Sequence, residues 1–282
     1  VWTAYGYLLA DPEIEAYALH DCDITTYSRE LLVRLCLPIV HPNFDFNFVK
    51  AYYARFTDQL HGRVVRLLVT PLVRSLIQCL GPDRFLSYLD SFRYPLSGEF
   101  SITADLASVN RVPGDWGLEV GTLAEVYRNV SIKRVCQVDI CPQYDHKHQP
   151  SSFDDPTQGL MKMGTDIITS LFRTLTAMGT TLHHENYVTI RAAYLRNAQD
   201  AIQQYAADAE MNSLRLDRHA EELIAESFAR LIVAAGKSVT KDPTGAGEIP
   251  NWARVQSAFP DVPAKLRAAA RADAVEHAVP AH

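Results

Sequence analysis

The stretch Tyr17-Ala18-Leu19-His20-Asp21-Cys22-Asp23 decides which fold and which chemistry we expect of this chain. Its short apolar run predicts a buried strand, and the strand ends in two carboxylates one residue apart. In open α/β sheets, ligands bind beyond the carboxyl ends of the strands, where this pair would project. The two carboxylates repel each other, so they must be hydrated, protonated or neutralised by a cation such as Mg²⁺ or Mn²⁺. Taken alone, Asp-x-Asp is also typical of a solvated turn.

The composition indicates a globular enzyme and excludes several partners. The 282 residues are 48% hydrophobic and 21% charged, with a net charge of −6 and no dominant basic run, so no nucleic acid is expected. The longest apolar stretch, residues 67–80, contains Arg74 and Gln78, so no membrane span is expected. The five cysteines form no Cys-x-x-Cys pair, which predicts reduced thiols and a cytoplasmic protein.

Hydrophobic periodicity and turn residues predict an α/β first half and an all-α second half. Strands are expected at residues 17–19, 46–56 and 134–140, and a loop at 94–100. Helices are expected at residues 28–37, 64–80, 85–92, 115–128, 157–178, 185–210, 217–235 and 262–279, with a second loop at 237–251. Pro38 should close the helix at 28–37, and Pro71 should kink the next helix or mark its true start. We therefore expect two parts, residues 1–154 and residues 155–282.

Three further groups of polar residues are candidates for binding. Gly62-Arg63 precedes a predicted helix, where free N–H groups and a guanidinium suit a phosphate or carboxylate, although Arg63 could be a solvated first-turn residue. The turn His146-Lys147-His148 follows a predicted strand and can direct one imidazole toward a metal. Glu99 and Glu119 lie at loop–helix edges and could contact sugar hydroxyls, although Glu119 could equally be an acid favoured by the helix dipole.

Six short blocks stand in one order along the first half of the chain. They are His20-Asp21-Cys22-Asp23, Phe48-Val49-Lys50-Ala51-Tyr52-Tyr53, Gly62-Arg63-Val64, Pro95-Leu96-Ser97-Gly98-Glu99, Trp116-Gly117-Leu118-Glu119-Val120-Gly121 and the turn that carries His146. In this order the chain resembles the retaining GT-A glycosyltransferases that make glucosyl-3-phosphoglycerate or its mannosyl counterpart. The resemblance covers residues 17–149, and the helical tail adds little to it.

The resemblance implies a fold and a set of site residues. The fold is α/β, a GT-A (Rossmann-like nucleotide-diphospho-sugar transferase) core that here lacks its N-terminal, nucleotide-binding half, followed by an α-helical C-terminal region. The implied metal ligands for Mg²⁺ or Mn²⁺ are Asp21, Asp23 and His146, with Asp23 the direct ligand. The implied acceptor-binding residues are Gly62, Arg63, Val64 and His148. The implied residues for the donor sugar are Lys50, Gly98 and Glu99. The implied catalytic residues are Glu119 and Asp23.

The implied reaction moves a hexose, glucose in the first instance, from a nucleotide-diphosphate sugar to 3-phosphoglycerate or a similar small anionic acceptor. A homodimer is expected, and the chain without upstream residues is not expected to turn over a nucleotide sugar. His148 stands where the family more often has Asn, and Val65 where Thr is usual. These two departures leave the acceptor open.

Two other classes of function remain open. Asp21-Cys22-Asp23-Ile24-Thr25 also matches the Asp-x-Asp-x-Thr of haloacid-dehalogenase-like phosphatases, with Asp21 as the nucleophile and Asp23 as the acid. Residues 114–119 even resemble the later acidic motif of those enzymes, but this reading leaves Gly62-Arg63 and His146 unexplained. The other alternative is a non-catalytic helical interaction module that carries a decayed transferase half.

Overall fold

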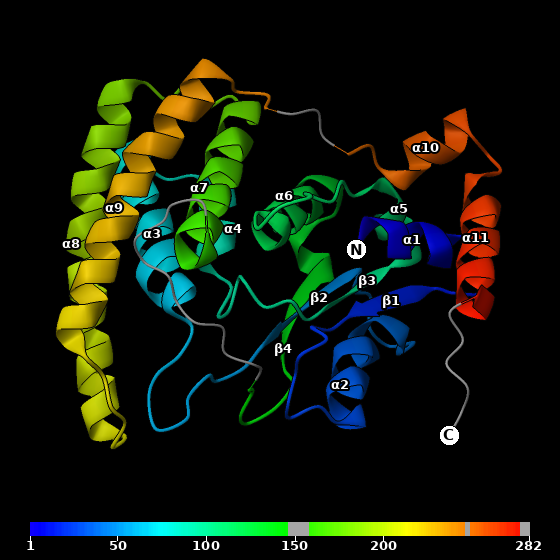
Figure 1. Cartoon of the computed structure of the whole chain (residues 1–282), viewed down its shortest axis with the longest axis horizontal. Coiled ribbons are helices and arrows are strands. Elements are labelled where there is room, and N and C mark those ends of the chain that lie inside the picture. Colours follow the sequence, from blue (N-terminus) through cyan, green and yellow to red (C-terminus); the bar gives the residue numbers. More distant parts are fainter. Residues whose placement is uncertain (146–157, 246–248, 277–282) are drawn as a thin grey trace.

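The protein is built around a mixed sheet, which lies at the centre of the molecule in Figure 1. The structure is a computed structural model that describes residues 1–145, 158–245 and 249–276. The described strands are β1 (Ala16–Leu19), β2 (Phe48–Tyr52), β3 (Phe100–Thr103) and β4 (Val135–Asp139), in the spatial order β1-β3-β2-β4. Strand β3 is antiparallel to β1 and β2, and β2 is parallel to β4. The carboxyl ends of β1, β2 and β4 therefore meet the amino end of β3 at one edge.

Strand β3 corrects the prediction for residues 94–100, because it begins at Phe100, where a loop was expected. Its register brings separate parts of the chain together: Phe100 pairs with both Leu19 and Lys50. This strand is four residues long, which is too short for a recognisable alternation of apolar and polar residues. The pairing of β3 nevertheless sets which residues lie at the common edge.

The two faces of the sheet pack against different helices. Helix α2 (Arg29–Val40) covers one face, where Leu31 and Leu35 pack with Val49 and Ala51. Phe48 belongs to a larger core cluster on the other face, together with residues of α3 (Thr70–Leu80), α4 (Arg84–Asp90), α6 (Leu118–Asn129) and α7 (Gly159–Ala177). The sheet is thus buried on both faces, as in other α/β proteins.

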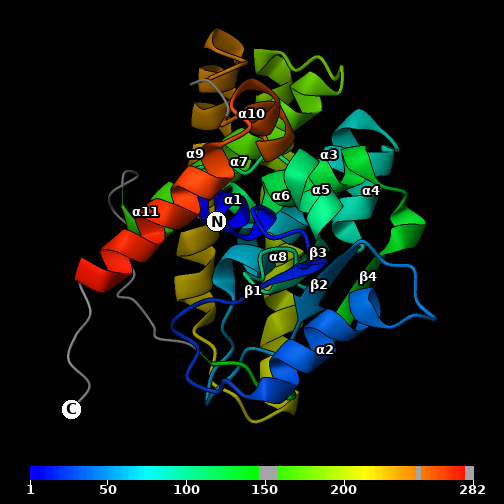
Figure 2. The same ribbon diagram turned by 90° about the vertical axis from the view of Figure 1, so that its right-hand side faces the viewer.

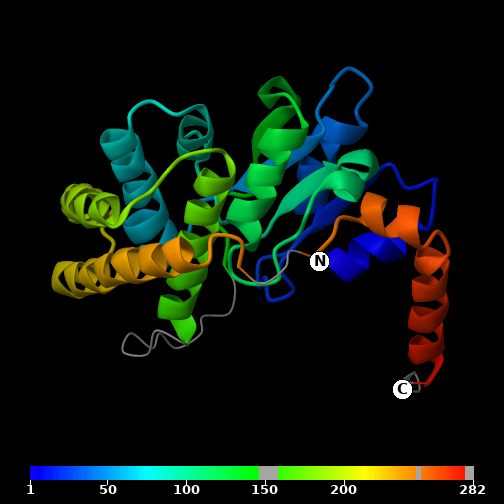
Figure 3. The same ribbon diagram turned by 90° about the horizontal axis from the view of Figure 1, so that it is seen from above.

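The longest helices stand side by side at one end of the molecule, away from the sheet (Figures 1 and 3). Helix α8 (His184–Met211) packs on α9 (Arg218–Lys241) and on α3, and α9 packs on α7. One core cluster contains residues of α3, α7, α8 and α9. The second half of the chain therefore shares its core with a helix of the first half. The fold class expected of the chain, an α/β core with an α-helical C-terminal region, is confirmed.

The last two described helices leave this bundle and pack at the opposite end (Figures 2 and 3). Helix α10 (Trp252–Ala258) contacts α5 (Ala104–Val109), and α11 (Val262–Glu276) contacts α1 (Trp2–Leu9). The rings of Trp2 and Trp252 stack with their centres 4.3 Å apart, and Trp252 Nε1 donates to Trp2 O at 2.7 Å.

The predicted boundary at residues 154 and 155 lies outside the described residues and stays a prediction. No described helix is long and apolar enough to cross a bilayer.

Most predicted elements are present, and the exceptions have physical reasons. Helix α2 continues through Pro38 to Val40. Pro38 lies in the last turn, where it deprives the carbonyl of Arg34 of an N–H donor. Because Arg34 is exposed, water can bind that carbonyl instead. Helix α9 extends to Lys241, so the loop predicted at 237–251 was wrong for its first residues. The short helices α5 and α10 were not predicted, because one or two turns give too little periodicity.

Pro71 lies in the first turn of α3, as expected of a proline that marks the true start of a helix. The segment η1 (Val64–Val69) is a π-helix, and α3 begins at Thr70 with Pro71 in its first turn. Proline has no N–H, so it cannot donate to the carbonyl of Leu67, the partner that an α-helix would give it. The buried hydroxyl of Tyr194, in α8, donates to that carbonyl at 2.6 Å. Tyr194 thereby supplies a hydrogen bond that the backbone lacks.

We expect Tyr194→Phe to lower the free energy of unfolding by about 1–3 kcal/mol, because it leaves a buried carbonyl without its donor. Urea denaturation followed by circular dichroism measures the loss. Tyr27→Phe is the matched control, because Tyr27 is 50% exposed and its hydroxyl has no partner among the described residues. Equal denaturation midpoints for Tyr194→Phe and the unaltered protein would contradict the role given to this hydroxyl.

Candidate active site

Charged side chains converge at the edge where the strand ends meet. Asp21 follows β1 by two residues, Lys50 lies in β2, and Glu99 directly precedes β3. Because Phe100 pairs with both Leu19 and Lys50, these three residues must lie close together. Glu119 joins them from the first turn of α6. We call Asp21, Lys50, Glu99 and Glu119 the acidic cluster.

Glu99 is fully buried and is held by hydrogen bonds from three directions. Its Oε2 accepts from the Tyr53 hydroxyl at 2.6 Å, and its Oε1 accepts from the Tyr144 hydroxyl and, at 3.2 Å, from the backbone N–H of Asp21. The rings of Tyr53 and Tyr144 stack with centres 3.8 Å apart. A carboxylate can be buried at this depth because such hydrogen bonds replace its hydration. Burial and the nearby Glu99 charge raise the pKa of both tyrosines.

Lys50 is the counterion of the cluster. Its side chain is 1% exposed, and its Nζ donates to the carbonyl of Ser97 at 2.6 Å. Burial lowers the pKa of Lys50 to about 8, while the charges of Glu119, Glu99 and Asp21 oppose that fall. The ammonium group therefore lies within electrostatic range of the three carboxylates, which favour its charged form.

The pKa of Asp21 is raised by its surroundings in the cluster. Burial of its carboxylate and the charges of Glu99, Glu119 and Asp23 raise the pKa of Asp21 to about 6, although the residue as a whole is exposed. The carboxylate packs against Gly98, where an added Cβ would lie 2.2 Å from Asp21 Oδ1. Only glycine fits there without displacing the carboxylate. This explains why a glycine precedes Glu99.

Glu119 of the acidic cluster and His20, the residue before Asp21, have buried polar atoms without a hydrogen-bond partner among the described residues. They are Oε2 of Glu119 and both ring nitrogens of His20. Burial raises the pKa of Glu119 and lowers that of His20, so both tend toward the neutral form. Sequence reasoning missed His20 as a site residue, and its place beside Asp21 is the signal that could have found it.

A second group of charged side chains lies around Gly62. Gly62 has φ +74°, and an added Cβ would lie 3.0 Å from the Tyr94 hydroxyl, so both backbone and space favour glycine. The Tyr94 hydroxyl accepts from Arg55 Nη1 at 3.0 Å. Arg63 Nε donates to Glu221 Oε1 at 2.8 Å. We call Arg55, Gly62, Arg63 and Arg66 the basic group.

The helix that begins beside Arg63 differs from the one predicted, because its first turn is the π-helix η1. Arg66 N donates to Gly62 O at 3.0 Å, so one of the N–H groups expected to bind an anion is already engaged. The side chain of Val64 is buried and faces the core, which leaves only its backbone for a ligand. Arg63 itself is partly exposed, so its guanidinium is the group best placed to meet an anion.

A chain of contacts joins the acidic cluster to the basic group. The Tyr53 hydroxyl binds Glu99, and the Tyr53 ring lies 5.1 Å from the Tyr94 ring, measured between centres. Tyr94 in turn contacts Arg55 and packs against Gly62. The two groups are therefore neighbours, separated by two aromatic rings.

The predicted site residues fall into these two groups. The acidic cluster unites Asp21, Lys50, Glu99 and Glu119 with Gly98, and Asp23 lies near enough to affect the pKa of Asp21. His146 and His148 lie outside the described residues, and their roles stay predictions. Within residues 1–145, 158–245 and 249–276, no three His, Cys, Asp or Glu side chains are grouped so that they could hold a metal ion.

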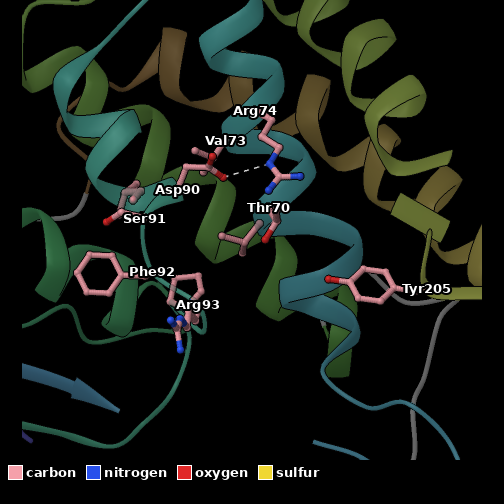
Figure 4. A pocket seen from close by; sticks show the side chains of 11 residues that line it. Thr70, Val73, Arg74, Asp90, Ser91, Phe92, Arg93 and Tyr205 are labelled. Atoms are coloured by element: carbon pink, nitrogen blue, oxygen red, sulfur yellow. Dashed lines mark hydrogen bonds and ion pairs between the residues drawn. The ribbon is translucent and has the colours of Figure 1, made fainter. Parts of the chain in front are cut away.

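Two cavities lie near these groups. One, of about 340 Å³, is lined by Gln59, Leu60, Arg63, Arg215, Leu216, Asp217 and Glu221. The other, of about 220 Å³, lies between α3, α4 and α8, where Arg74 forms an ion pair with Asp90 at 3.2 Å (Figure 4). The second cavity contains none of the predicted site residues, whereas the first contains Arg63.

Comparison with known proteins gives two curated relatives, both named glucosyl-3-phosphoglycerate synthase. The relative from Persephonella marina is 46% identical over 273 residues, which are 97% of this chain. The relative from Methanococcoides burtonii is 44% identical over 281 residues, which are 98% of this chain. The chain covers 68% of the length of each. No family model matches the chain.

Solved structures with some similarity include glucosyl-3-phosphoglycerate synthase from Mycobacterium tuberculosis. The complex of that enzyme with phosphoglyceric acid has a TM-score of 0.47 at 20% identity, and covers 64% of this chain and 56% of its own. Its complex with Mn²⁺, UDP-glucose and phosphoglyceric acid has a TM-score of 0.47 at 21% identity, and covers 64% and 55%. The present chain thus spans little more than half the length of these solved chains.

The raised pKa of Asp21 predicts how stability depends on pH. Because the folded-state pKa of about 6 lies above the ordinary 3.8, the folded protein binds more protons between these values, so this carboxyl stabilises the fold at low pH. That stabilisation is lost as the pH rises through 6. We expect Asp21→Asn to have almost no effect on the free energy of unfolding well below pH 3.8 and to stabilise the metal-free protein above pH 6.

Urea denaturation of both proteins in chelator, at about pH 3 and at about pH 7.5, measures this difference. The pair of proteins at low pH is the internal control, because the carboxyl is then largely neutral in both states. A difference in stability that does not change with pH would show that burial and the neighbouring carboxylates do not raise the pKa of Asp21 in the folded protein.

Proposed function

Since the chain belongs to the glucosyl-3-phosphoglycerate synthase family, we propose that it transfers a glucosyl group from a nucleotide-diphosphate sugar to 3-phosphoglycerate. The observation that carries this proposal is the adjacency of the acidic cluster and the basic group, joined through Tyr53 and Tyr94. A cation-bound diphosphate suits the carboxylates, and a free phosphate suits the arginines. A transferase needs these two sites side by side.

The donor side is assigned to the Asp-x-Asp pair. Asp21 and Asp23, with His146 as the third ligand, would hold Mg²⁺ or Mn²⁺. The donor set fits such an ion, because hard divalent cations prefer carboxylate oxygens and because a cation would favour the ionised form of Asp21, whose pKa is raised by burial and by the neighbouring carboxylates. When bound, the ion neutralises the negative charge that develops on the departing diphosphate.

The protein's own groups shape the donor side. Lys50 and Glu99 are buried beneath the loop that contains Gly98, and they fix this loop against Asp21. Contact of Gly98 and of these two side chains with the donor sugar is part of the proposal. Glu119, whose Oε2 has no partner in the described part of the chain, is assigned to the acceptor hydroxyl. In a retaining transfer the departing phosphate oxygen takes the proton of that hydroxyl, so Glu119 orients the hydroxyl without acting as a strong base.

The acceptor side is assigned to Gly62, Arg63 and Val64, with His148 nearby. Arg63 lines the cavity of about 340 Å³ and is partly exposed. A guanidinium binds phosphate and carboxylate groups through parallel N–H donors, which suits a small acceptor with two anionic groups.

Family membership favours this transferase over the haloacid-dehalogenase-like phosphatase that the Asp-x-Asp-x-Thr motif also allows. The proposed transfer to 3-phosphoglycerate gives the basic group a role, whereas the phosphatase reading gives it none. A homodimer stays a prediction. Binding of a nucleotide sugar by the complete protein would argue against the non-catalytic interaction module.

We expect Asp23→Ala to abolish transfer while leaving the fold intact, because the diphosphate then lacks a ligand that holds its neutralising cation. The measurement is turnover of nucleotide-glucose by the complete protein, with Mg²⁺ and then with chelator. Asp273→Ala, which removes an exposed carboxylate of α11, is the control and should keep full activity. Undiminished turnover by Asp23→Ala in chelator would exclude the metal role.

We expect Arg63→Ala to weaken acceptor binding by about 1.5–3 kcal/mol, the range for a hydrogen bond to a charged group. The KM for the donor should change little, because the donor is held by the acidic cluster. Steady-state kinetics with each substrate varied separately measure both values.

Arg74→Ala is the matched control for Arg63→Ala, since Arg74 lines the other cavity and is paired with Asp90. A rise in the donor KM alone, or equal use of glycerate and 3-phosphoglycerate, would show that the phosphate site lies elsewhere.

A further inference from the structure

Glu221 joins two arginines of the basic group to the helical region. It lies in the first turn of α9, and its side chain is 3% exposed. Its Oε1 accepts from Arg63 Nε and its Oε2 accepts from Arg66 Nη1, each at 2.8 Å. A carboxylate buried this deeply is tolerated only when it is paired, so these three side chains form one charged unit. We call Arg63, Arg66 and Glu221 the triad.

Arg66 is the fixed member of the triad. Its Nε donates to the carbonyl of His61 at 2.9 Å, and its guanidinium lies 4.8 Å from the centre of the Tyr205 ring in α8. Its Nη2 is buried and has no hydrogen-bond partner among the described residues. A buried guanidinium N–H without a partner is costly, and a bound anion would satisfy it.

Arg63 is the accessible member. Only its Nε has a partner in the described part of the chain, its side chain is 35% exposed, and it lines the cavity of about 340 Å³ together with Glu221. The two Nη groups are therefore left for a ligand. Two guanidinium groups and one carboxylate leave the triad with one net positive charge, so the triad attracts an anion even with Glu221 in place.

We propose that Glu221 is a positioning residue for the acceptor, acting through Arg63, because Arg66 is also held by His61 and Tyr205; this inference rests on the proposed function. The carboxylate holds Arg63 by its Nε, so the long side chain is oriented before the anion arrives and loses less conformational freedom on binding. Helix α9, far along the chain, thereby sets the geometry of the acceptor site.

Glu221 has an opposing effect, because its negative charge weakens the attraction of the triad for an anion. Removing it would raise the net charge of the triad and also free the Arg63 side chain. We expect orientation to dominate, because Arg63 is more than a third exposed, where solvent screens charge, while misplacement of a binding group is expensive.

The test is Glu221→Gln in the complete protein, with the acceptor and donor varied separately. We expect the acceptor KM to rise about tenfold, and the donor KM to stay within about twofold. In an Arg63→Ala background the same substitution should change the acceptor KM by less than about twofold, because Glu221 acts through Arg63. Tyr194→Phe, which loosens the contact between α8 and η1 without touching the triad, should lower stability and leave the acceptor KM unchanged.

The outcomes separate this inference from the proposed function. An unchanged or lower acceptor KM in Glu221→Gln, or an equal effect in both backgrounds, overturns the positioning role. An acceptor KM that Arg63→Ala itself leaves unchanged overturns the proposed phosphate site. Glu221→Asp is the second variant if Glu221→Gln does not fold: it keeps the charge but shortens the reach, and the acceptor KM should rise while the donor KM does not.

Discussion

The site depends on one buried ammonium group. Lys50 is 1% exposed and lies beneath Asp21, Glu99 and Glu119, which would otherwise be three carboxylates in a confined space. A buried cation is unfavourable alone, and so is a group of buried anions, but each lowers the free energy of the other. The pKa of Lys50 falls only to about 8 because the carboxylates oppose the effect of burial. The ammonium group and the carboxylates therefore favour each other's charged forms.

Lys50 also helps to hold the loop before β3 against strand β2. Its Nζ donates to Ser97 O, and the Ser97 hydroxyl donates to Ala51 O at 2.8 Å, so the loop before β3 is bound to β2 at two points. That loop carries Gly98 and Glu99, and Glu99 holds the backbone of Asp21. The arrangement of the sheet, the loop and the Asp-x-Asp pair is thus one hydrogen-bonded system. Displacing any part of it would move the carboxylates.

The sequence predicted the parts of this system that have local signals. The strand before Asp21 was evident from its apolar run, the start of α3 from Pro71, and the candidate residues Glu99 and Gly62 from the family blocks. The pairing of β3 with two other strands was not predictable, because register is set by contacts distant in sequence. For the same reason the partners of Glu99, Tyr53 and Tyr144, were found only in the structure.

Glu221 shows most clearly why part of the site is invisible in the sequence. An acid in the first turn of a helix is ordinary, because the helix dipole favours it there. Its pairing with Arg63 and Arg66 spans 158 and 155 residues and requires α9 to lie against η1. That contact in turn depends on apolar residues of α7, α8 and α9, which share one core with the sheet. A helical region that adds little to the recognisable motifs therefore still has a reason to be retained, since it supplies the counterion of two arginines.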